Sequence, residues 1–413
     1  MDTTLLIFTL VYLALALGHL PGFRVDRTGA VVAGALAMVA LGRIGDQAAW
    51  AAIDDRTIGL LFGLMVVSGA FVVSGFYSWV AARIASLPVS PPMLLAILVA
   101  TGGVLSALLT NDVVVVAMTP LLVAITLSRG LNPTPFLLGF CFACNTGSAA
   151  TLIGSPQNMV AASALHLDFT GFLKVALVPA LLSLPIVWTV VALLYRGRWM
   201  LLPGQGPATA PAALPDALPL DVVETGKAAL VTLAVMLAFV LTDWPHDMVA
   251  LGAAAVMLVN RTVASKDVLK AVDGNLLLLL MGLFVVNAAF AATGVPQKAI
   301  TGLSTMGIDL TRAPVLYGVV SVLSNIVGNN PAVMLLAPFV AHAPEPQALG
   351  AAFALGTGFS SNLIVFGSLA GIIVVEQAAA RGVTITTGEF CRAGVPVALS
   401  CLAMGLVWIL LIG

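Results

Sequence analysis

Long apolar stretches, separated by short polar connections, make up almost the whole of this chain of 413 residues. About 20 consecutive apolar residues are long enough to cross the hydrocarbon core of a bilayer as a helix. Hydrophobic residues make up 60% of the sequence and charged residues only 8%, whereas about a quarter of the residues of a soluble domain are charged. In lipid, only helices and closed barrels satisfy all backbone hydrogen-bonding groups. The sequence therefore predicts an all-α polytopic membrane protein.

Ten stretches have the length and composition of a full crossing. Two further pairs of apolar stretches are shorter and are broken by polar residues, so we expect each pair to form a re-entrant hairpin. The hairpin tips are then Asn111-Asp112 and Asn329-Asn330. The expected crossings are residues 4–20, 28–43, 57–77, 135–164, 170–195, 226–242, 246–260, 274–294, 347–377 and 389–412, and the expected hairpins are 90–108 with 113–127 and 313–327 with 332–342.

The polar tip of the first hairpin recurs about 218 positions later, once in each half of the chain. Helix-breaking residues match at a similar offset, with Gly63 opposite Gly282 and Pro179 opposite Pro396. Five crossings per half make the second half inverted relative to the first, which is a common architecture of secondary transporters. We therefore divide the chain into a first repeat, 1–198, a proline-rich cytoplasmic linker, 199–225, and a second repeat, 226–413.

The distribution of Lys and Arg favours an N-terminus outside the cell. In that orientation twelve of the 17 Lys and Arg residues, Arg24 and Arg27 among them, lie in cytoplasmic connections. Cytoplasmic connections are enriched in these residues, so we expect a multi-pass protein of the cell inner membrane, with the lipid bilayer as a partner. The net charge of −1 gives no excess of either sign, and we expect no nucleic-acid partner.

Each hairpin is followed by a span that glycine, proline and small polar residues interrupt. Irregular backbone is tolerated at membrane depth only where protein or water satisfies its polar groups. Broken helices also direct helix N-termini and free carbonyl groups toward a bound ion or substrate. We therefore predict that the tips and the interruptions form one central substrate and ion site. Its predicted residues are Thr110, Asn111, Asp112, Asn145, Thr146, Ser148, Gly154, Ser155, Gln157 and Asn158 from the first half, and Gly328, Asn329, Asn330, Thr357, Ser360, Ser361, Asn362 and Ser368 from the second.

Asp112 is the only acidic residue that the sequence places well inside the membrane. An ionised carboxylate there costs several kcal/mol unless it is paired or hydrated, so Asp112 is predicted to bind the coupling ion, H⁺ or Na⁺. Sodium would then lie near Asn111, Asp112 and Asn329. The alternative for the polar residues is structural, as helix caps or interhelical contacts. No Arg or Lys falls within the predicted site, so a polyanion without a co-bound cation is disfavoured.

Motifs of enzymatic or nucleotide-driven chemistry do not occur in the sequence. It contains no Walker loop, no His-Glu-x-x-His helix and no serine-hydrolase elbow. We therefore expect neither an enzyme nor a primary pump, no cofactor, and no metal other than a coupling ion. The segment Cys141-Phe142-Ala143-Cys144 has the spacing of a redox motif, but it lies in an apolar span, where core packing is favoured.

The hairpin and interruption motifs together resemble the ion transporter superfamily, which includes arsenite permeases, citrate and dicarboxylate/sodium transporters and NhaD-type sodium/proton antiporters. Asn111-Asp112 with Thr119-Pro120 is similar to the arsenite-permease branch. Residues 154–158 and 367–370 are similar to those of bacterial anion permeases. The tips differ from the Ser-Asn-Thr of the dicarboxylate/sodium transporters, since they read Thr110-Asn111-Asp112 and Gly328-Asn329-Asn330.

The resemblance implies two inverted repeats, each with a re-entrant hairpin and a discontinuous helix. A transport domain would move against a scaffold domain in an elevator-like cycle. It also implies a homodimer and, for a true arsenite permease, a soluble ATPase partner. The substrate that it implies is a small ion or a neutral hydroxide.

The predicted function is secondary active transport of a small anion or oxyanion, of the arsenite, antimonite or carboxylate kind, coupled to H⁺ or Na⁺. Three cases stay open: an anion carried with a cation, a neutral hydroxide exchanged for protons, and a cation as the substrate, as in a Na⁺/H⁺ antiporter. An ion channel is less favoured, because hairpins paired on inverted halves suit alternating access. An intramembrane enzyme is disfavoured because the sequence offers no paired nucleophile and base and no metal cluster.

Overall fold

Helices account for every regular element of the computed structural model, which describes residues 2–20, 22–201 and 218–412. Within these ranges the only extended pairing is two isolated bridges, one between His19 and Asp26 and one between Leu131 and Met200. Seven of the described helices are long and apolar enough to cross a membrane, and five shorter apolar helices accompany them. The predicted all-α membrane protein is confirmed.

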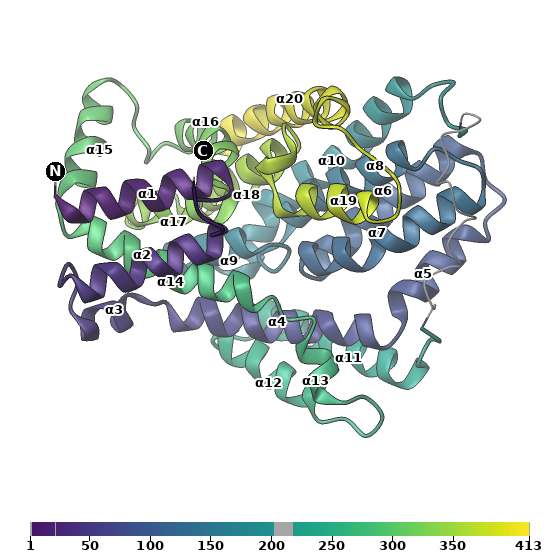
Figure 1. Ribbon diagram of the computed structural model, residues 1–413, viewed down its shortest axis with the longest axis horizontal. Coiled ribbons are helices and arrows are strands. Elements are labelled where there is room, and N and C mark those ends of the chain that lie inside the picture. Colours follow the sequence, from purple (N-terminus) through teal and green to yellow (C-terminus); the bar gives the residue numbers. More distant parts are fainter. Residues whose placement is uncertain (1, 21, 202–217, 413) are drawn as a thin grey trace.

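The two halves of the chain have the same order of elements (Figure 1). Within the residues that the structure describes, each half has ten α-helices and a single 3-10 turn, and the turn follows the eighth helix in both. The short helices α3, α5, α13 and α15 were not expected from the spans. The first half consists of α1 (Thr3–Leu17), α2 (Arg27–Ala40), α3 (Asp46–Ala52), α4 (Asp55–Val73), α5 (Phe76–Ala85), α6 (Pro91–Leu108), α7 (Asn111–Ser128), α8 (Pro133–Gly147), η1 (Ser148–Ala150), α9 (Pro156–Leu165) and α10 (Phe169–Leu194). The second consists of α11 (Val222–Leu241), α12 (His246–Leu258), α13 (Ser265–Leu269), α14 (Gly274–Ala291), α15 (Val295–Thr305), α16 (Ala313–Val327), α17 (Asn329–Val340), α18 (Pro346–Ser360), η2 (Val365–Gly367), α19 (Leu369–Ala379) and α20 (Thr387–Ile412).

Each half packs against the equivalent elements of the other half. Helix α4 packs on α12, and its counterpart α14 packs on α2. The second hairpin arm α7 packs on α19, and its counterpart α17 packs on α9. Figure 1 shows α11, α12 and α13 gathered along α4, below the remaining helices. This reciprocal packing is what two symmetry-related repeats produce, and it brings the polar segments of both halves to a shared interface.

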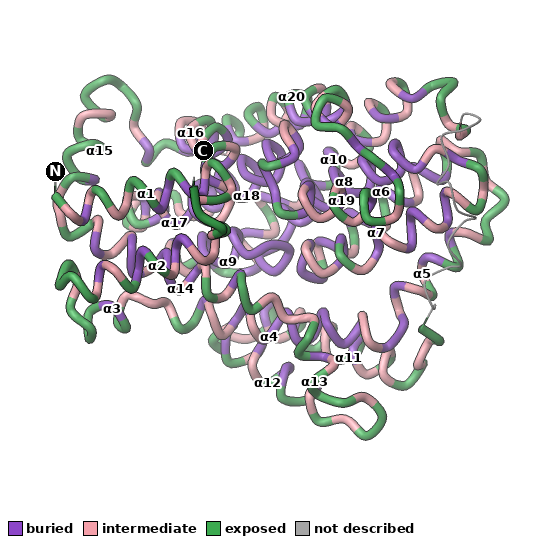
Figure 2. The backbone as a smooth tube through the Cα atoms, in the orientation of Figure 1, coloured by how far each residue is buried: buried purple, intermediate pink, exposed green. Residues whose placement is uncertain are grey.

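Burial separates a central pair of helices from peripheral ones (Figure 2). All residues of α8 are buried, and so is every residue of α18 from Ala348 onward. In α11, by contrast, only Ala228, Val235 and Phe239 are buried. A helix whose apolar side chains are exposed in the isolated chain is one that faces lipid. The interruptions that follow α8 and α18 therefore lie at the centre of the molecule.

Both predicted hairpins are present. In the first, α6 ends at Leu108 and α7 begins at Asn111, with extended backbone between them. In the second, α16 and α17 meet at Gly328, whose φ of 95° and ψ of 160° favour glycine because it has no Cβ. The second arm of the first hairpin, α7, is longer than the expected 113–127. Both arms have 18 residues, so each is long enough by length and composition for a crossing, which the sequence did not indicate.

Both predicted discontinuous helices are also present, within the expected spans 135–164 and 347–377. After α8, the chain makes the turn η1 and a further turn in which Gly154 N donates to the carbonyl oxygen of Thr151, and α9 then begins at Pro156. Proline suits the first position of a helix because its missing N–H has no partner there. After α18, the chain makes the turn η2, and Ser368 caps α19 by accepting a bond from Gly371 N at 3.0 Å.

Most of the predicted linker, residues 202–217, lies outside the described residues. On its C-terminal side α11 already begins at Val222, because Asp221 caps it by accepting bonds from Val223 N and Glu224 N, both at 3.0 Å. Helix α11 thus begins four residues before the expected crossing 226–242.

Candidate functional site

A cavity of about 490 Å³ lies where the two hairpin tips meet the interrupted helices. The tips come from α7 and α17, and the interruptions come from the start of α9 and the start of α19. Parts of both halves of the chain thus form one space, as the repeat predicted. The predicted site residues that line it are Asn111, Asp112, Gln157, Gly328, Asn329, Asn330 and Ser368.

The first tip is fixed by backbone contacts to the helix interruption beside it. Asn111 N donates to the carbonyl oxygen of Gly154 at 3.0 Å. A Cβ on Gly154 would overlap the carbonyl oxygen of Ser148, so only glycine permits this close approach. On the other side of the tip, Thr110 N donates to Ser68 Oγ at 3.3 Å. The side chains of Asn111 and Asp112 need no part in holding the tip.

The second tip is fixed through its side chains. Asn329 Nδ2 donates to Ser361 Oγ at 2.9 Å, and Ser361 Oγ in turn donates to the carbonyl oxygen of Thr357 at 2.7 Å. Asn325 Nδ2, one turn before the tip, donates to the carbonyl oxygen of Ser321 at 2.9 Å. The amide groups of Asn325 and Asn329 therefore turn their oxygen atoms away from these bonds.

Three side-chain oxygens of the cavity lining are buried and have no donor within the described part of the chain. They are the Oδ1 atoms of Asn111, Asn329 and Asn330. A buried acceptor without a partner costs about 1–3 kcal/mol, so such groups in a native structure call for a ligand, a water or an ion. Carboxylate and amide oxygens are the ligands that hard cations prefer. With the Asp112 carboxylate in the same cavity, this arrangement can bind a small cation.

The charged lining of the cavity differs from the expectation. The sequence indicated no Arg or Lys in the site, and this was wrong, because Arg27 lines the cavity. Four carboxylates share the lining with it: those of Asp26, Asp112, Asp273 and Glu376. Arg27 is the first residue of α2 and Asp273 caps α14, so both lie far in sequence from the tips. Arg27 and Asp273 reach the site only because the starts of α2 and α14 pack next to the tips. No local sequence motif predicts that packing.

Several predicted site residues instead hold the interrupted helices together. Asn145 Nδ2 donates to Asn362 Oδ1 at 2.9 Å and to Ser368 Oγ at 3.1 Å, so it joins the two halves at their centre. Asn158 Nδ2 donates to the carbonyl oxygens of Ser148 and Thr151, at 3.0 and 2.8 Å. These bonds satisfy groups that the missing helical turns leave free. Ser155, also buried, has no partner for its hydroxyl among the described residues.

Four further predicted residues bond to backbone of the preceding turn, and one of them, Ser360, also shares a hydrogen bond of 2.9 Å with Ser324 of α16. Thr146 and Ser148 donate to carbonyl oxygens three residues earlier, and Thr357 and Ser360 do so at three or four residues. Such back-bonding is the usual arrangement of Ser and Thr in apolar helices. These four residues support the packing of α8 and α18 and do not line the cavity.

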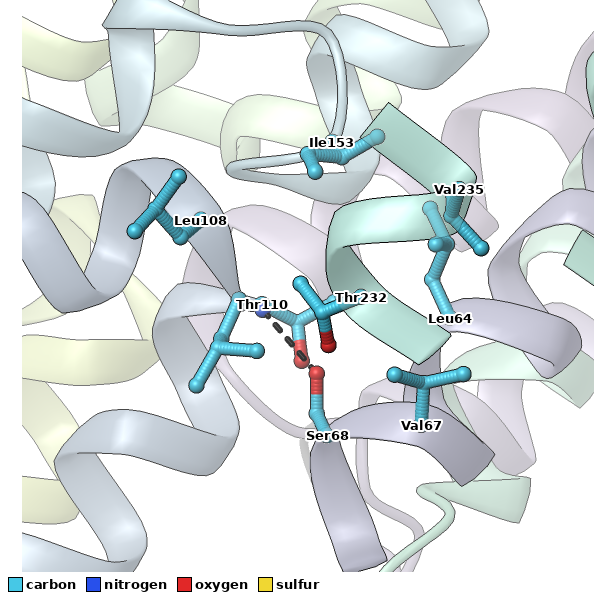
Figure 3. Close-up of a pocket in the computed structure, with 9 residues that line it drawn as sticks. Leu64, Val67, Ser68, Leu108, Thr110, Ile153, Thr232 and Val235 are labelled. Carbon is cyan, nitrogen blue, oxygen red and sulfur yellow. Dashed lines mark hydrogen bonds between the residues drawn. The ribbon is translucent and has the colours of Figure 1, made fainter. Parts of the chain in front are cut away.

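Thr110 supports the first tip from outside the cavity (Figure 3). It lines a separate space of about 10 Å³ with Ser68 of α4 and Thr232 of α11, surrounded by Leu64 and Val67. Figure 3 shows the bond from Thr110 N to Ser68 Oγ at its base. A space of this size holds at most one water molecule. Thr110 thus connects the tip to α4 and cannot contact a substrate in the main cavity.

Comparison with known proteins gives the family. The sequence profile described as citrate transporter matches residues 4–358, most of the chain. The chain belongs to the citrate transporter family. It is therefore a membrane transporter and not an enzyme, and the resemblance to the ion transporter superfamily is confirmed.

Relatives and a solved structure agree with this family membership. The chain is 30% identical to an uncharacterized transporter of Mycobacterium tuberculosis, over 94% of each chain. It is 26% identical to the silicon efflux transporter of Oryza sativa subsp. japonica, over 87% of this chain and 86% of the rice protein. The crystal structure of the YdaH transporter of Alcanivorax borkumensis superposes with a TM-score of 0.60 over 98% of this chain and 95% of that one, at 16% identity. That structure supports the fold alone.

Removal of the central amide is expected to weaken the fold of this citrate transporter family member. Asn145→Ala leaves Asn362 Oδ1 buried without the donor it has now, so we expect the free energy of unfolding to fall by about 1–3 kcal/mol. The control is Asn275→Ala, because Asn275 is exposed and its side chain makes no hydrogen bond in the described part. Thermal unfolding of the purified proteins in detergent measures both. Equal midpoints for the two variants would contradict the role of Asn145.

Proposed function

We propose that this secondary transporter couples the movement of a small weak acid, a carboxylate or an oxyacid, to a cation bound at Asp112. The single observation that carries the proposal is the shared cavity, in which Asp112 and three unpaired amide oxygens from both halves face one space. Substrate and coupling ion of such transporters meet at the interface of the repeats.

A bound cation accounts for the chemistry of the tips. An ionised carboxylate at membrane depth is costly unless a positive charge or water accompanies it. Asp112 is partly buried and makes no hydrogen bond through its side chain within the described residues. The amide oxygens of Asn111, Asn329 and Asn330 supply neutral ligands of the kind that Na⁺ accepts. Protonation of Asp112 would neutralise the same charge, so H⁺ serves equally as the coupling ion.

The net charge of the cavity lining limits the charge that the substrate can carry when it binds. Four carboxylates and one guanidinium give the cavity a negative balance, which opposes a multiply charged anion unless cations bind with it. A cavity of about 490 Å³ has the size of a small-molecule site. The family is named for citrate and a relative for silicon efflux, and both names agree with a small hydroxylated acid. We propose the neutral or singly charged form of such an acid.

The exposed polar residues of the lining, Asp26, Asn275 and Glu376, form what we call the rim. They lie at the start of α2, at the start of α14 and near the end of α19, next to three connections that the distribution of Lys and Arg assigns to the cytoplasm. In that orientation the cavity is open to the cytoplasm, and the opposite state needs the tips and interruptions to move relative to α4 and its neighbours. This proposed motion corresponds to an elevator-like cycle with alternating access.

Exchange of Na⁺ for H⁺ is a second candidate function. It is favoured by the excess of carboxylates over guanidinium in the lining, since such a lining attracts cations without needing an acid. In this case Asp112 would bind the two cations in turn.

Reconstitution into proteoliposomes tests both candidates. We expect an imposed Na⁺ or H⁺ gradient to drive accumulation of a labelled monocarboxylate or of arsenite, and a collapsed gradient to allow equilibration only. The control is liposomes without protein. Sodium-driven proton movement, reported by an internal pH dye in the absence of any acid, would favour the antiporter. Substrate uptake that does not depend on a Na⁺ or H⁺ gradient would contradict the proposed coupling.

A further inference from the structure

We propose that Arg27 binds the anionic group of the substrate, and that the site accepts an acid with a single negative charge. This inference rests on the proposed function and adds to it the charge class of the substrate and the residue that selects it.

Arg27 lines the cavity without a partner of its own. It is the first residue of α2 and is half-buried. Its Nε is shielded from solvent and has no hydrogen-bond partner within the described ranges. No carboxylate there lies within 4.0 Å of its nitrogens, since the ion pairs found join Arg43 to Asp2 and Lys270 to Asp267. An arginine that merely anchored a helix end would turn its guanidinium to water or to a carbonyl group.

The neighbouring Arg24 shows the contrast. It lies in the connection between α1 and α2, three residues before Arg27, but it is exposed and does not line the cavity. The two residues carry the same charge on the same side of the molecule. Of the two, only Arg27 is half-buried and has a guanidinium nitrogen, Nε, that is shielded from water without a partner. Partial removal of a charge from water is unfavourable unless an opposite charge accompanies it.

The carboxylates of the lining differ in whether a hydrogen bond from the protein or water stabilises their charge. Asp26 accepts a bond from Gly29 N at 2.8 Å, and Asp273 accepts one from Leu276 N at 3.0 Å, so each caps a helix N-terminus. Glu376 is exposed at the rim, where water solvates it. Of the charges that line the cavity, Asp112 and Arg27 therefore keep neither a protein partner nor full hydration.

One cation at Asp112 and one anionic group at Arg27 would neutralise both remaining charges. A planar guanidinium binds a carboxylate or an oxyanion through two parallel N–H bonds. A second negative charge on the substrate would face the caps Asp26 and Asp273 without a further cationic side chain in the lining. The ligand class is therefore a small monocarboxylate or a singly ionised oxyacid, bound together with one monovalent cation.

Equilibrium binding to the purified full-length protein tests this inference. The probes are acetate and lactate as monoanions, citrate as a polyanion and orthosilicic acid as a neutral acid. Each is titrated with and without Na⁺ and over a range of pH, and binding is followed by thermal stabilisation. We expect a monocarboxylate to bind the native protein most tightly. In Arg27→Gln we expect its affinity to fall about 10- to 100-fold, with the stabilisation by Na⁺ alone unchanged. Arg24→Gln is the matched control and should bind as the native protein does.

Arg27→Lys separates a binding role from a folding role. It keeps the positive charge and loses the forked geometry, so we expect intermediate affinity in a protein that folds normally. Anion affinity equal to that of the native protein in Arg27→Gln or, if that variant does not fold, in Arg27→Lys would overturn the inference. Tightest binding of citrate or of orthosilicic acid would overturn the charge class. If neither thermal stability nor probe affinity depended on Na⁺ or pH, the proposed coupling would be contradicted. The comparison of the Arg27 and Arg24 variants would still test the anion site.

Discussion

Asp112→Asn is expected to abolish accumulation of the substrate against its gradient in proteoliposomes. The variant keeps the shape of the side chain and the first tip, which is fixed by backbone bonds of Thr110 and Asn111. It removes the one carboxylate of the cavity that neither caps a helix nor lies at the rim. Loss of a charged ligand typically costs about 1.5–3 kcal/mol, so we expect affinity for the coupling cation to fall about 10- to 100-fold. Gradient-driven uptake and Na⁺-dependent thermal stabilisation measure the two effects.

Glu376→Gln is the matched control for Asp112→Asn. It removes a carboxylate from the same lining, but Glu376 is exposed and solvated. Screening by salt makes an exposed charge of this kind worth little, so we expect uptake close to that of the native protein. If Asp112→Asn retained full gradient-driven uptake, Asp112 would have no role in coupling. If both variants lost uptake equally, the effect would belong to the net charge of the cavity.

Gly394→Ala is expected to destabilise the protein more than any other substitution proposed above. Gly394 lies in α20 against the interruption that follows α18, and a Cβ there would overlap the carbonyl oxygen of Asn362. The obstacle is backbone, which cannot move away as a flexible side chain would. Overpacking of a well-packed core costs about 1–3 kcal/mol or more, and we expect a loss of about 3 kcal/mol or failure to fold. Thermal unfolding in detergent and size-exclusion profiles report both outcomes.

Gly388→Ala, in the same helix, provides the comparison. A Cβ at Gly388, the second residue of α20, would meet no atom within 4 Å, and alanine is a better helix former than glycine. We expect a midpoint equal to or slightly above that of the native protein. A Gly394→Ala protein that unfolds at the same temperature as Gly388→Ala would show that the contact with Asn362 can relax.

The membrane architecture was predictable because its signals are local. Apolar length identifies a crossing, and a proline or a polar pair inside an apolar stretch identifies a break. The tips at Asn111 and Asn329 and the interruption next to Pro156 were found in this way. Recurrence in the second half then distinguished these breaks from chance. Short helices such as α5 were not predicted. Helix α5 directly follows a longer apolar span, and its amino-acid composition does not distinguish it from that span.

The composition of the site was predictable only in part. The tips do meet in one cavity, as the repeat indicated. Asn145 and Asn362 were expected in the site, yet they bond to each other across the two halves. The side-chain amide of an asparagine beside a helix break can bond either to the protein or to a ligand. The residue type alone therefore does not show which of the two it binds. Arg27 was missed for a different reason, because its approach depends on how a connection distant in sequence packs over the tips.

The packing of helices of one half against helices of the other affects how the chain reaches its native state. Helices α9 and α2 find their packing partners α17 and α14 only in the second half, so these surfaces stay uncovered while the ribosome is still producing that half. The last helix, α20, packs on α8, α10 and α18, and the central interface is completed only when it arrives. Contacts of such long sequence separation form late and slowly. We therefore expect a nascent first half to depend on the insertion machinery or a membrane chaperone, and two separately synthesised halves to assemble only when they are produced together.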